Sequence, residues 1–358
     1  MTMFTYDGLP GRVVFGAGVA RERLLGEVDL LGARRVLVIA GDTESEIATR
    51  LCAPFADRVA ATFTQVRPHV PVEVAELARK ASSEADADLV LSVGGGSTTG
   101  TAKAVALTTG LPVLAVPTTY AGSEVTPVWG MTDRGRKTTG TDRRVLPKTV
   151  VYDAELTVTL PVDLSVASGL NAVAHCVEAF WAPRRSPVAS AMAEDGIRHL
   201  VAGLTTVTGD PTGPVGRGEL LLGAYLAGSA FAVAGSGLHH KICHVLGGAF
   251  DLPHAQTHAI VLPHVLAYNA PHATEACARI ARALGRTDIV TALRELGAGL
   301  GVPPDLRALG LNESDIDTVL AEIVAIAPPD NPTPVTEEGL RTILHAAWAG
   351  TDPMGPTP

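Results

Sequence analysis

The sequence predicts two domains, an N-terminal α/β domain built on a parallel sheet and an all-helical C-terminal domain. From Ala33 to about Asp153, short apolar runs alternate with helical stretches, whereas after about Leu160 the chain is rich in alanine, leucine and other helix formers. A chain of 358 residues is long enough for two domains, each with its own core. We expect the first domain to span residues 1–158 and the second to span residues 159–358.

Four apolar runs predict buried strands. They are RRVLVIAGD (34–42), ADLVLSVGGGS (87–97), LPVLAVPTT (111–119) and KTVVYDAE (148–155). Amphipathic helical segments such as VEVAELARKASSEA (72–85) separate them. Strands that are apolar on both faces and alternate with helices indicate a Rossmann-like parallel sheet, covered on both sides. Residues 127–146 break this pattern with glycines and polar residues, so we expect a β-hairpin there.

Several C-terminal segments are apolar nearly all round, which is typical of helices buried in a bundle. Examples are PVDLSVASGLNAVAHCVEAFW (161–181), GELLLGAYLAGSAFAVAG (218–235) and TEACARIARALG (274–285). The proline-rich stretch APPDNPTP (327–334) predicts a loop. We expect Thr336 to cap a last helix that runs through His345 and Trp348.

Composition excludes several classes of protein. The net charge is −9 and no long basic run occurs, so we expect no nucleic-acid partner. The N-terminus lacks a signal pattern and no apolar stretch is long enough to span a bilayer, so we expect no membrane partner. The four cysteines form no C-x-x-C pair and read as reduced thiols of a cytoplasmic protein.

A glycine triplet follows one predicted strand and opens a helix. Glycines allow backbone N–H groups to approach a ligand, and a helix N-terminus adds positive potential, which together suit a pyrophosphate. Polar residues follow the next strand, and the carboxyl ends of parallel strands meet at one edge. The predicted cofactor-binding residues are Gly94, Gly95, Gly96, Ser97, Thr118, Thr119 and Ser123.

The triplet alone is weak evidence, because glycine-rich turns between strand and helix are common in α/β folds. It fits neither G-x-G-x-x-G nor the P-loop with its Lys-Ser/Thr pair. The paired threonines make a cofactor site the better interpretation.

Seven of the eleven histidines fall between His239 and His272. His240 and His244 are four residues apart on a helical segment, so their rings face the same way. Asn171 and His175 have the same spacing, and His254 opens a third segment. We expect these three segments to converge into one pocket. The other histidines read as loop, helix-cap or surface residues: His69, His199, His258, His264, His272 and His345.

Five motifs resemble those of the iron-containing alcohol dehydrogenase superfamily, over nearly the whole chain. They are GGGS (94–97), PTTYAGSEVTP (117–127), GLNAVAHCVEA (169–179), HKICH (240–244) and PHA (253–255). The resemblance implies a dehydroquinate synthase-like architecture, a nicotinamide cofactor and a homodimer. It places the family's aspartate and three histidine metal ligands on Asn171, His175, His240 and His254. It places the histidine near the reacting carbon on His244.

One departure from the family pattern concerns the metal. Asn171 replaces the ligand aspartate, and a neutral amide brings no charge to offset a dication. His175, His240 and His254 could still hold zinc. We nevertheless expect that a divalent metal is absent or not required.

Within the superfamily, several stretches resemble the maleylacetate reductase branch. They are YDGLPGRVVFG, GGGSTTG, VPTTYAGSE, GRKTTG and GLHHKICHVLGG. The resemblance implies reduction of maleylacetate, a small dicarboxylate from aromatic-compound breakdown, to 3-oxoadipate by NADH or NADPH.

Hydride addition to the conjugated double bond would leave an enolate, which hydrogen-bond donors can stabilise in place of a metal. We expect His244 to be the proton donor. His240 and Lys241 are candidate anchors for the oxyanion or a carboxylate, although Lys241 also reads as a solvated lysine. His175, His254 and the amide of Asn171 complete the predicted site.

Two further features bear on the cofactor. Arg136 and Lys137, in the GRKTTG stretch, could meet the cofactor or a substrate carboxylate, although a charged hairpin tip is usually solvated. Asp42 follows the first predicted strand, where an acid would exclude the 2′-phosphate of NADP. Because Asp42 lies one residue beyond where the family's aspartate aligns, NADH and NADPH both stay open.

Two alternatives remain. The first is a metal-dependent alcohol or polyol dehydrogenase of the same superfamily, which metal analysis and chelation would distinguish. The second is a ligand-binding or regulatory protein on a decayed dehydrogenase scaffold. The intact glycine loop and the polar constellation around the histidines argue against decay.

Overall fold

The computed structural model describes residues 4–9, 11–134 and 136–352. Its contacts divide the chain into two compact units. Leu9–Pro161 and Asp210–Leu221 form the first, and Val162–Gly209 with the chain from Leu222 onward form most of the second. The sequence-based boundary at residue 158 stays a prediction.

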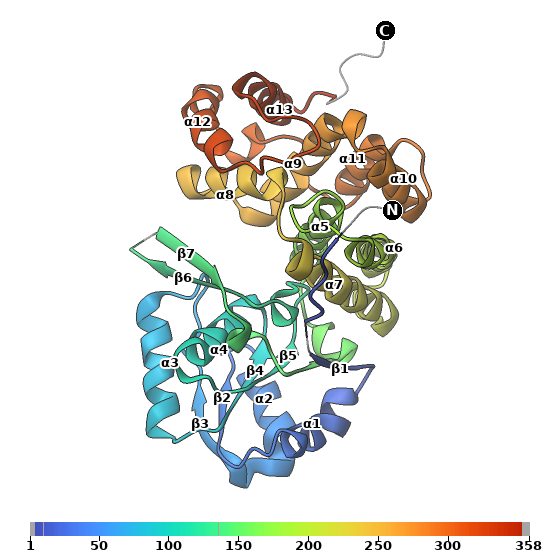
Figure 1. Cartoon of the computed structure of the whole chain (residues 1–358). Helices are drawn as coiled ribbons and strands as arrows, with labels where there is room; N and C mark the ends of the chain where they lie inside the picture. Colours follow the sequence, from blue (N-terminus) through green and yellow to red (C-terminus); the bar gives the residue numbers. More distant parts are fainter. Residues whose placement is uncertain (1–3, 10, 135, 353–358) are drawn as a thin grey trace. The chain divides into compact units, whose positions relative to one another are not determined.

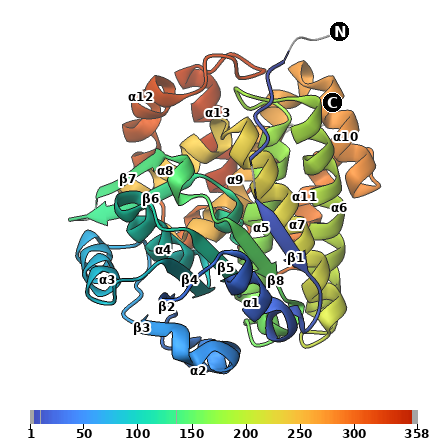
Figure 2. The same cartoon turned by 60° about the horizontal axis from the view of Figure 1, so that its bottom comes forward.

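The first unit contains a six-stranded parallel sheet with helices on both faces (Figures 1 and 2), so the predicted α/β class is confirmed. The strand order is β1-β8-β5-β4-β2-β3. The strands are β1 (Arg12–Phe15), β2 (Val36–Ile39), β3 (Val59–Phe63), β4 (Leu89–Gly94), β5 (Val113–Pro117) and β8 (Thr149–Tyr152). The helices are α1 (Val19–Leu30), α2 (Ser45–Cys52), α3 (Val72–Glu84) and α4 (Gly96–Thr109).

Alternate side chains of β2, β4 and β5 enter different cores, which is why these strands are apolar throughout. On β2, Val36 and Val38 pack with residues of α1 and α2. Leu37 and Ile39 point to the other face and pack with residues of α3 and α4. The sheet is therefore held between two helical layers, as its sequence predicts.

The predicted hairpin is also confirmed. β6 (Val128–Asp133) and β7 (Arg136–Thr141) pair antiparallel, and β6 packs along α4. Gly135 lies outside the described residues. The hairpin places a polar ribbon beside the helix that follows the glycine triplet.

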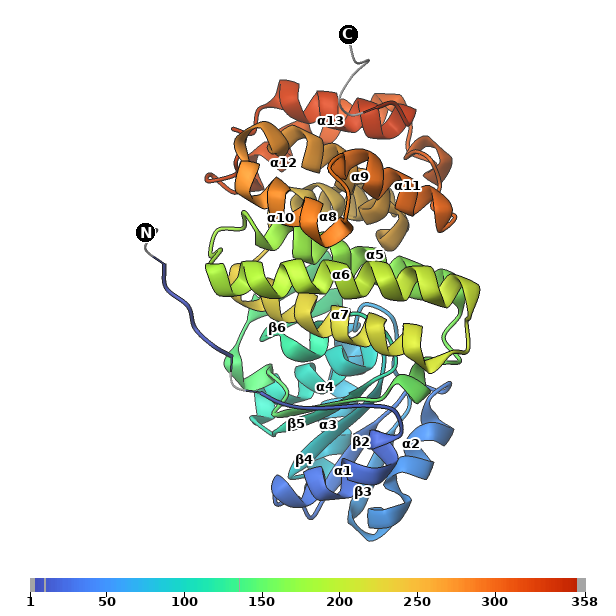
Figure 3. The same cartoon turned by 90° about the vertical axis from the view of Figure 1, so that its right-hand side faces the viewer.

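The second unit is helical, as predicted, and Figure 3 shows its helices. They are α5 (Val162–Ala179), α6 (Pro187–Gly209), α7 (Pro214–Ala234), α8 (Leu238–Phe250), α9 (His254–Asn269), α10 (Thr274–Leu284), α11 (Ile289–Gly299), α12 (Ile316–Ile326) and α13 (Glu337–Ala349). The first turns of α7 belong to the other unit. Helix α9 is central, because it packs against α5, α8, α11 and α13. Thr336 caps α13 as predicted, accepting a hydrogen bond from the N–H of Gly339 at 3.0 Å.

Within the described ranges, no single helix is long and apolar enough to cross a membrane. Helices α7 and α8 meet the criteria of length and composition only as a pair, and that pair is bent by 98°.

Candidate active site

The two predicted cofactor segments lie side by side at the carboxyl ends of β4 and β5. Gly94 pairs with Pro117 in the sheet, and its carbonyl accepts a hydrogen bond from the N–H of Thr118 at 3.1 Å. A Cβ atom on Gly95 would lie 2.9 Å from Cγ2 of Thr119, closer than real Cβ atoms approach. Any larger residue at position 95 would therefore have to displace the side chain of Thr119.

The glycine triplet leaves the N-terminus of α4 open. Gly95 is the N-cap, no side chain caps the helix, and the first turn holds no acidic residue. The N–H groups of Gly96, Ser97 and Thr98 therefore lack helical partners, as in the first turn of any helix. Such an end binds anions, and phosphate in particular. The cofactor role of this loop stays a prediction, and its geometry suits that role.

The remaining predicted cofactor residues lie around this edge. Ser123 begins a short 3₁₀ turn, Ser123–Val125, after the loop that follows β5. Asp42 is exposed in the turn after β2, the strand next to β4. Arg136 and Lys137 are exposed on β7. Within the described residues, Arg136 pairs with Asp133 and Lys137 with Thr132 in the hairpin, and the carbonyl of Asp42 accepts a hydrogen bond from the hydroxyl of Ser45.

In the helical unit, the four predicted histidines come together. The ring of His175 on α5 stacks on that of His240 on α8, with 4.8 Å between centroids. The rings of His240 and His244 lie 6.1 Å apart, as do those of His244 and His254. The structure therefore brings the rings of the three segments together. A shared substrate pocket and catalytic roles for these histidines stay predictions.

Two histidines that the sequence interpretation left out belong to the same cluster. His258 is fully buried, with its ring centroid 4.3 Å from that of His254 and 4.8 Å from that of His240. The expectation that His258 is a helix-cap or surface residue is therefore wrong. His239 is also buried, and its Nε2 lies 3.0 Å from Nδ1 of His258. His254 and His258 have the same four-residue spacing as the two pairs used in the prediction. This spacing could have identified His258 as a member of the cluster.

Glu178, on α5, contacts the histidine cluster and was not among the residues predicted from the sequence. Its side chain is 0% exposed, and its carboxylate accepts hydrogen bonds from the N–H groups of Gly237 (2.9 Å) and His239 (2.6 Å) at the start of α8. The same carboxylate bonds Nδ1 of His240. Burial raises the pKa of Glu178, and the positive end of α8 opposes that shift. Glu178 thus holds α8 and the His240 ring together.

The bond to Glu178 decides which nitrogen of His240 is available. A carboxylate that already accepts backbone N–H groups acts as an acceptor towards Nδ1 as well, which assigns the proton of the neutral ring to Nδ1. Nε2 then carries a lone pair, and it is buried without a hydrogen-bond partner among the described residues. Neutral His240 can accept a proton or bind a cation at Nε2, but it cannot donate there.

Burial keeps the inner histidines neutral. It lowers the pKa of His175, His240 and His258 well below the ordinary value of 6.5, and that of His239 to about 3. Neighbouring histidines lower these pKa values further. An anionic substrate near these histidines would therefore contact neutral imidazole rings rather than positively charged imidazolium ions.

Other predicted residues are more accessible. His244 and His254 are exposed, whereas Asn171 and Lys241 are partly buried. After burial and the neighbouring histidines, the charge of Lys241 adds to the lowering of the His240 pKa. Lys241 therefore lies close enough to the cluster to act on it.

The donor atoms of the cluster fit a cation in part. Four side-chain atoms of Asn171 and of the clustered histidines are buried and have no hydrogen-bond partner in the described region: Asn171 Oδ1, His175 Nδ1, His240 Nε2 and His258 Nε2. Ligand atoms of His239, His240 and His258 also lie within 4.8 Å of one another. Imidazole nitrogens suit zinc. All of these donors are neutral, so none offsets the charge of a dication.

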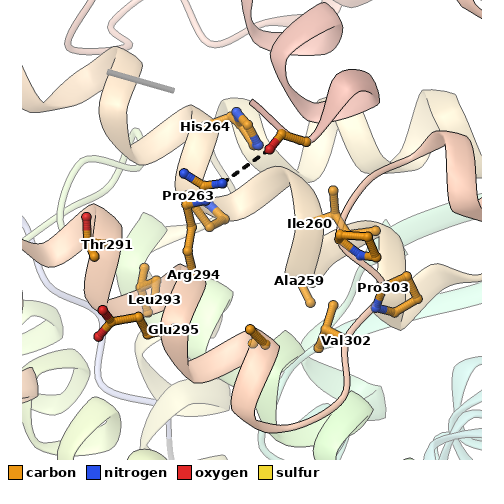
Figure 4. Close-up of a pocket in the computed structure, with 14 residues that line it drawn as sticks. Ala259, Ile260, Pro263, His264, Thr291, Leu293, Arg294, Glu295, Val302 and Pro303 are labelled. Carbon is orange, nitrogen blue, oxygen red and sulfur yellow. Dashed lines mark hydrogen bonds between the residues drawn. The ribbon is translucent and has the colours of Figure 1, made fainter. Parts of the chain in front are cut away.

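A pocket of about 360 Å³ lies elsewhere in the helical unit, lined by α9, α11 and the loop after α11. Figure 4 shows Leu293 and Arg294 on one side of it and Val302 and Pro303 on the other. His264 lines this pocket and is buried, so the expectation that it caps a helix or lies at the surface is wrong. Burial lowers its pKa to about 4. None of the predicted site residues lines this pocket.

Comparison with known families identifies both halves of the chain. A family model described as iron-containing alcohol dehydrogenase matches residues 10–154. A second, described as Fe-containing alcohol dehydrogenase family, C-terminal, matches residues 165–348.

Individual relatives match over the full length. A maleylacetate reductase from Sphingobium indicum is 48% identical over 351 residues, covering 98% of this chain and 99% of that protein. One from Burkholderia cepacia is 45% identical and covers 99% of this chain and 100% of that protein. Among solved structures, an iron-containing alcohol dehydrogenase from Corynebacterium glutamicum is 48% identical with a TM-score of 0.96 and full coverage of both chains. A maleylacetate reductase from Agrobacterium tumefaciens is 41% identical with a TM-score of 0.94, covering 98% of this chain and 100% of that chain.

Proposed function

The chain belongs to the Fe-containing alcohol dehydrogenase family and, within it, to the maleylacetate reductases, and from this premise we propose that it reduces maleylacetate to 3-oxoadipate with NADH or NADPH. The chain is thus an oxidoreductase. The observation that carries the proposal is the histidine cluster, which combines accessible rings at His244 and His254 with a buried set of neutral donors. By the same resemblance we propose a cytoplasmic homodimer.

NADH or NADPH, held at the glycine loop, would supply a hydride to the carbon β to the ketone of maleylacetate. The two electrons of the double bond then move to form an enolate, with negative charge on the ketone oxygen. A proton must be delivered to the carbon α to the ketone to give 3-oxoadipate. The protein therefore has to supply one proton donor and to stabilise one developing oxyanion.

His244 is the proton donor in this proposal. Its ring is exposed and joins the cluster through His240 and His254, so substrate can reach it. General acids in such positions contribute roughly a hundred- to ten-thousand-fold to rate.

The role expected of His240 changes. An oxyanion needs a donor, and neutral His240 presents a lone pair at Nε2 because its proton faces Glu178. We therefore assign oxyanion or carboxylate binding to Lys241 and to the amide of Asn171. His240 would then orient the substrate by accepting a hydrogen bond from it at Nε2. The ring of His175 stacks on the ring of His240.

A metal ion, if bound, would be held by His175, His240 and Asn171, with His254, and would supply Lewis-acid polarisation of a carbonyl oxygen. The neutral ligand set gives it little compensating charge, and the substrate of the proposed reaction is a conjugated dianion. We propose that reduction does not depend on a metal.

A metal-dependent alcohol or polyol dehydrogenase is the second candidate. It is favoured by the four buried donor atoms without partners, which a cation would satisfy. The decisive experiment follows the oxidation of NADH and of NADPH by purified protein with maleylacetate, and identifies 3-oxoadipate by mass spectrometry. Alcohol oxidation without turnover of maleylacetate would overturn the proposal in favour of this candidate.

A further inference from the structure

Lys103, on α4, is a fully buried lysine that the proposed mechanism does not use. Its residue exposure is 0%. A buried ammonium is costly unless each of its N–H groups finds an acceptor. The acceptors of Lys103 therefore indicate what this residue does.

All three N–H groups of Lys103 have backbone acceptors in one short segment. Nζ donates to the carbonyl oxygens of Ser123 at 2.5 Å, Thr126 at 2.8 Å and Val128 at 2.8 Å. The hydroxyl oxygens of Ser123 and Thr126 lie 3.2 and 3.1 Å from the same nitrogen. One ammonium thus gathers the segment from Ser123 to Val128 around itself.

This segment and α4 carry two parts of the proposed cofactor site. Helix α4 begins at Gly96, two turns before Lys103, with its open N-terminus at the glycine triplet. Ser123, at the start of the segment, is the last residue proposed to bind the cofactor. A shift of the segment away from α4 would therefore change the distance between these two parts.

We infer that Lys103 is a positioning residue of the cofactor site, whose ammonium holds Ser123–Val128 against α4 and so fixes Ser123 relative to the glycine loop. The inference rests on the proposed use of NADH or NADPH. Lys103 itself is buried beneath this segment, and it acts through the backbone rather than by touching the cofactor.

The charged groups around Lys103 predict that cofactor binding depends on pH. Burial lowers the pKa of Lys103 to about 7. The charge of Glu124, on the 3₁₀ turn Ser123–Val125, opposes this shift. Glu124 is buried, and burial raises its own pKa, although it accepts a hydrogen bond from the hydroxyl of Tyr152 on β8 at 2.7 Å. From α3, Arg79 faces α4 but donates to the carbonyl of Ala104 at 3.0 Å. The 3₁₀ turn Arg143–Val145, which also packs on α4, contributes Arg143 and Arg144; Arg144 pairs with Asp142.

Loss of a proton leaves an amine with two N–H groups for three carbonyl acceptors. One carbonyl of the segment then loses its donor and the amine lone pair faces it. Cofactor affinity should therefore be highest with Lys103 protonated, and should fall as the pH rises through the pKa of this group.

The test compares Lys103→Met with Lys80→Met in full-length protein. Lys80 is an exposed lysine of α3, in the same unit. The dissociation constant of NADH, or of NADPH if the wild type prefers it, is measured by fluorescence titration, with the melting temperature recorded alongside. We expect Lys103→Met to weaken cofactor binding about tenfold or more, and Lys80→Met to leave it unchanged. The KM for cofactor should rise while kcat at saturating cofactor is retained.

The pH profile separates positioning from general destabilisation. Between about pH 6 and pH 9 the wild-type dissociation constant should rise, whereas that of folded Lys103→Met should be flat. Parallel profiles, or unchanged affinity in the variant, overturn the inference. If the variant does not fold, a flat wild-type profile overturns it. A wild type that binds neither NADH nor NADPH would instead refute the proposed function.

Discussion

Glu178 accepts a hydrogen bond from Nδ1 of His240, and this contact leaves Nε2 as the ring nitrogen that is available to the histidine cluster. The same carboxylate binds the first N–H groups of α8, so the helix that carries His240 and His244 is held by the residue that orients one of them. The buried carboxylate of Glu178 thus links the stability of α8 to the orientation of the His240 ring.

Replacing Glu178 with Gln should separate these two functions. The amide oxygen can still accept from Gly237 or His239, but the amide NH₂ group would face Nδ1 of His240 and force the ring proton to Nε2. We expect kcat to fall by about one to two orders of magnitude, with a loss of stability of roughly 1–3 kcal/mol. Steady-state kinetics and thermal melts measure both. The control is Glu295→Gln, whose side chain is 58% exposed. Wild-type turnover in Glu178→Gln would show that the tautomer of His240 does not matter.

Gly95→Val tests the phosphate loop. A Cβ atom at position 95 would already lie 2.9 Å from Cγ2 of Thr119, so a valine must push the two proposed cofactor segments apart. Cofactor affinity should fall by about a hundredfold, equivalent to roughly 3 kcal/mol, while the helical unit keeps its fold. Gly26→Val, on α1, is the control, because a Cβ atom there meets nothing within 4 Å. Equal cofactor affinity in the two variants would mean that the loop is wrongly assigned.

His244→Ala tests the proton donor. The proposal predicts that kcat falls by roughly a hundred- to ten-thousand-fold, with little change in the dissociation constant of the cofactor. His272→Ala serves as the control, because His272 is exposed and its Nδ1 contacts the Thr333 hydroxyl at 3.0 Å. A variant at His244 that keeps most of its turnover moves the proton-donor role to another group, with exposed His254 the first to examine.

The inner strands of the sheet could be predicted because both of their faces are buried. β2, β4, β5 and β8 are the four runs identified from the sequence, and each lies inside the sheet. The edge strands β1 and β3 were not predicted. Their side chains are partly exposed, so neither has the continuous apolar pattern that marks a buried strand.

Helical spacing in the sequence predicted which histidines lie together, but not all members of the cluster. Helical spacing brought His175, His240 and His244 to one place, whereas the buried His258 was set aside despite the same spacing from His254. The hydrogen-bond partners of Glu178 at the start of α8 lie 59 or more residues along the chain, and those of Lys103 lie 20 or more residues along it. A local sequence pattern does not reveal such contacts. In the sequence, Lys103 reads as an ordinary helical lysine, and only the fold shows its three carbonyl acceptors.

The last prediction concerns the metal, and it depends on Asn171. The amide oxygen of Asn171 is buried without a hydrogen-bond partner in the described structure, as are imidazole nitrogens of His175, His240 and His258. A carboxylate at this position would add a negative charge to an otherwise neutral donor set. Asn171→Asp should therefore bind zinc or iron more tightly, by about tenfold or more, which equilibrium dialysis with metal analysis would measure.

Reduction of maleylacetate should not depend on metal binding, and Asn171→Asp should lower its rate. Wild-type protein treated with a chelator should keep its full rate with maleylacetate, because the proposed reaction places negative charge on a conjugated enolate that Lys241 and the Asn171 amide can bind. Asn171→Asp should reduce more slowly, since a new anion would face the carboxylates of the substrate. Asn171→Ala is the matched variant, because it removes the amide without adding charge. Loss of wild-type activity on chelation, restored by zinc or iron, would contradict the metal-independent mechanism and favour the metal-dependent dehydrogenase.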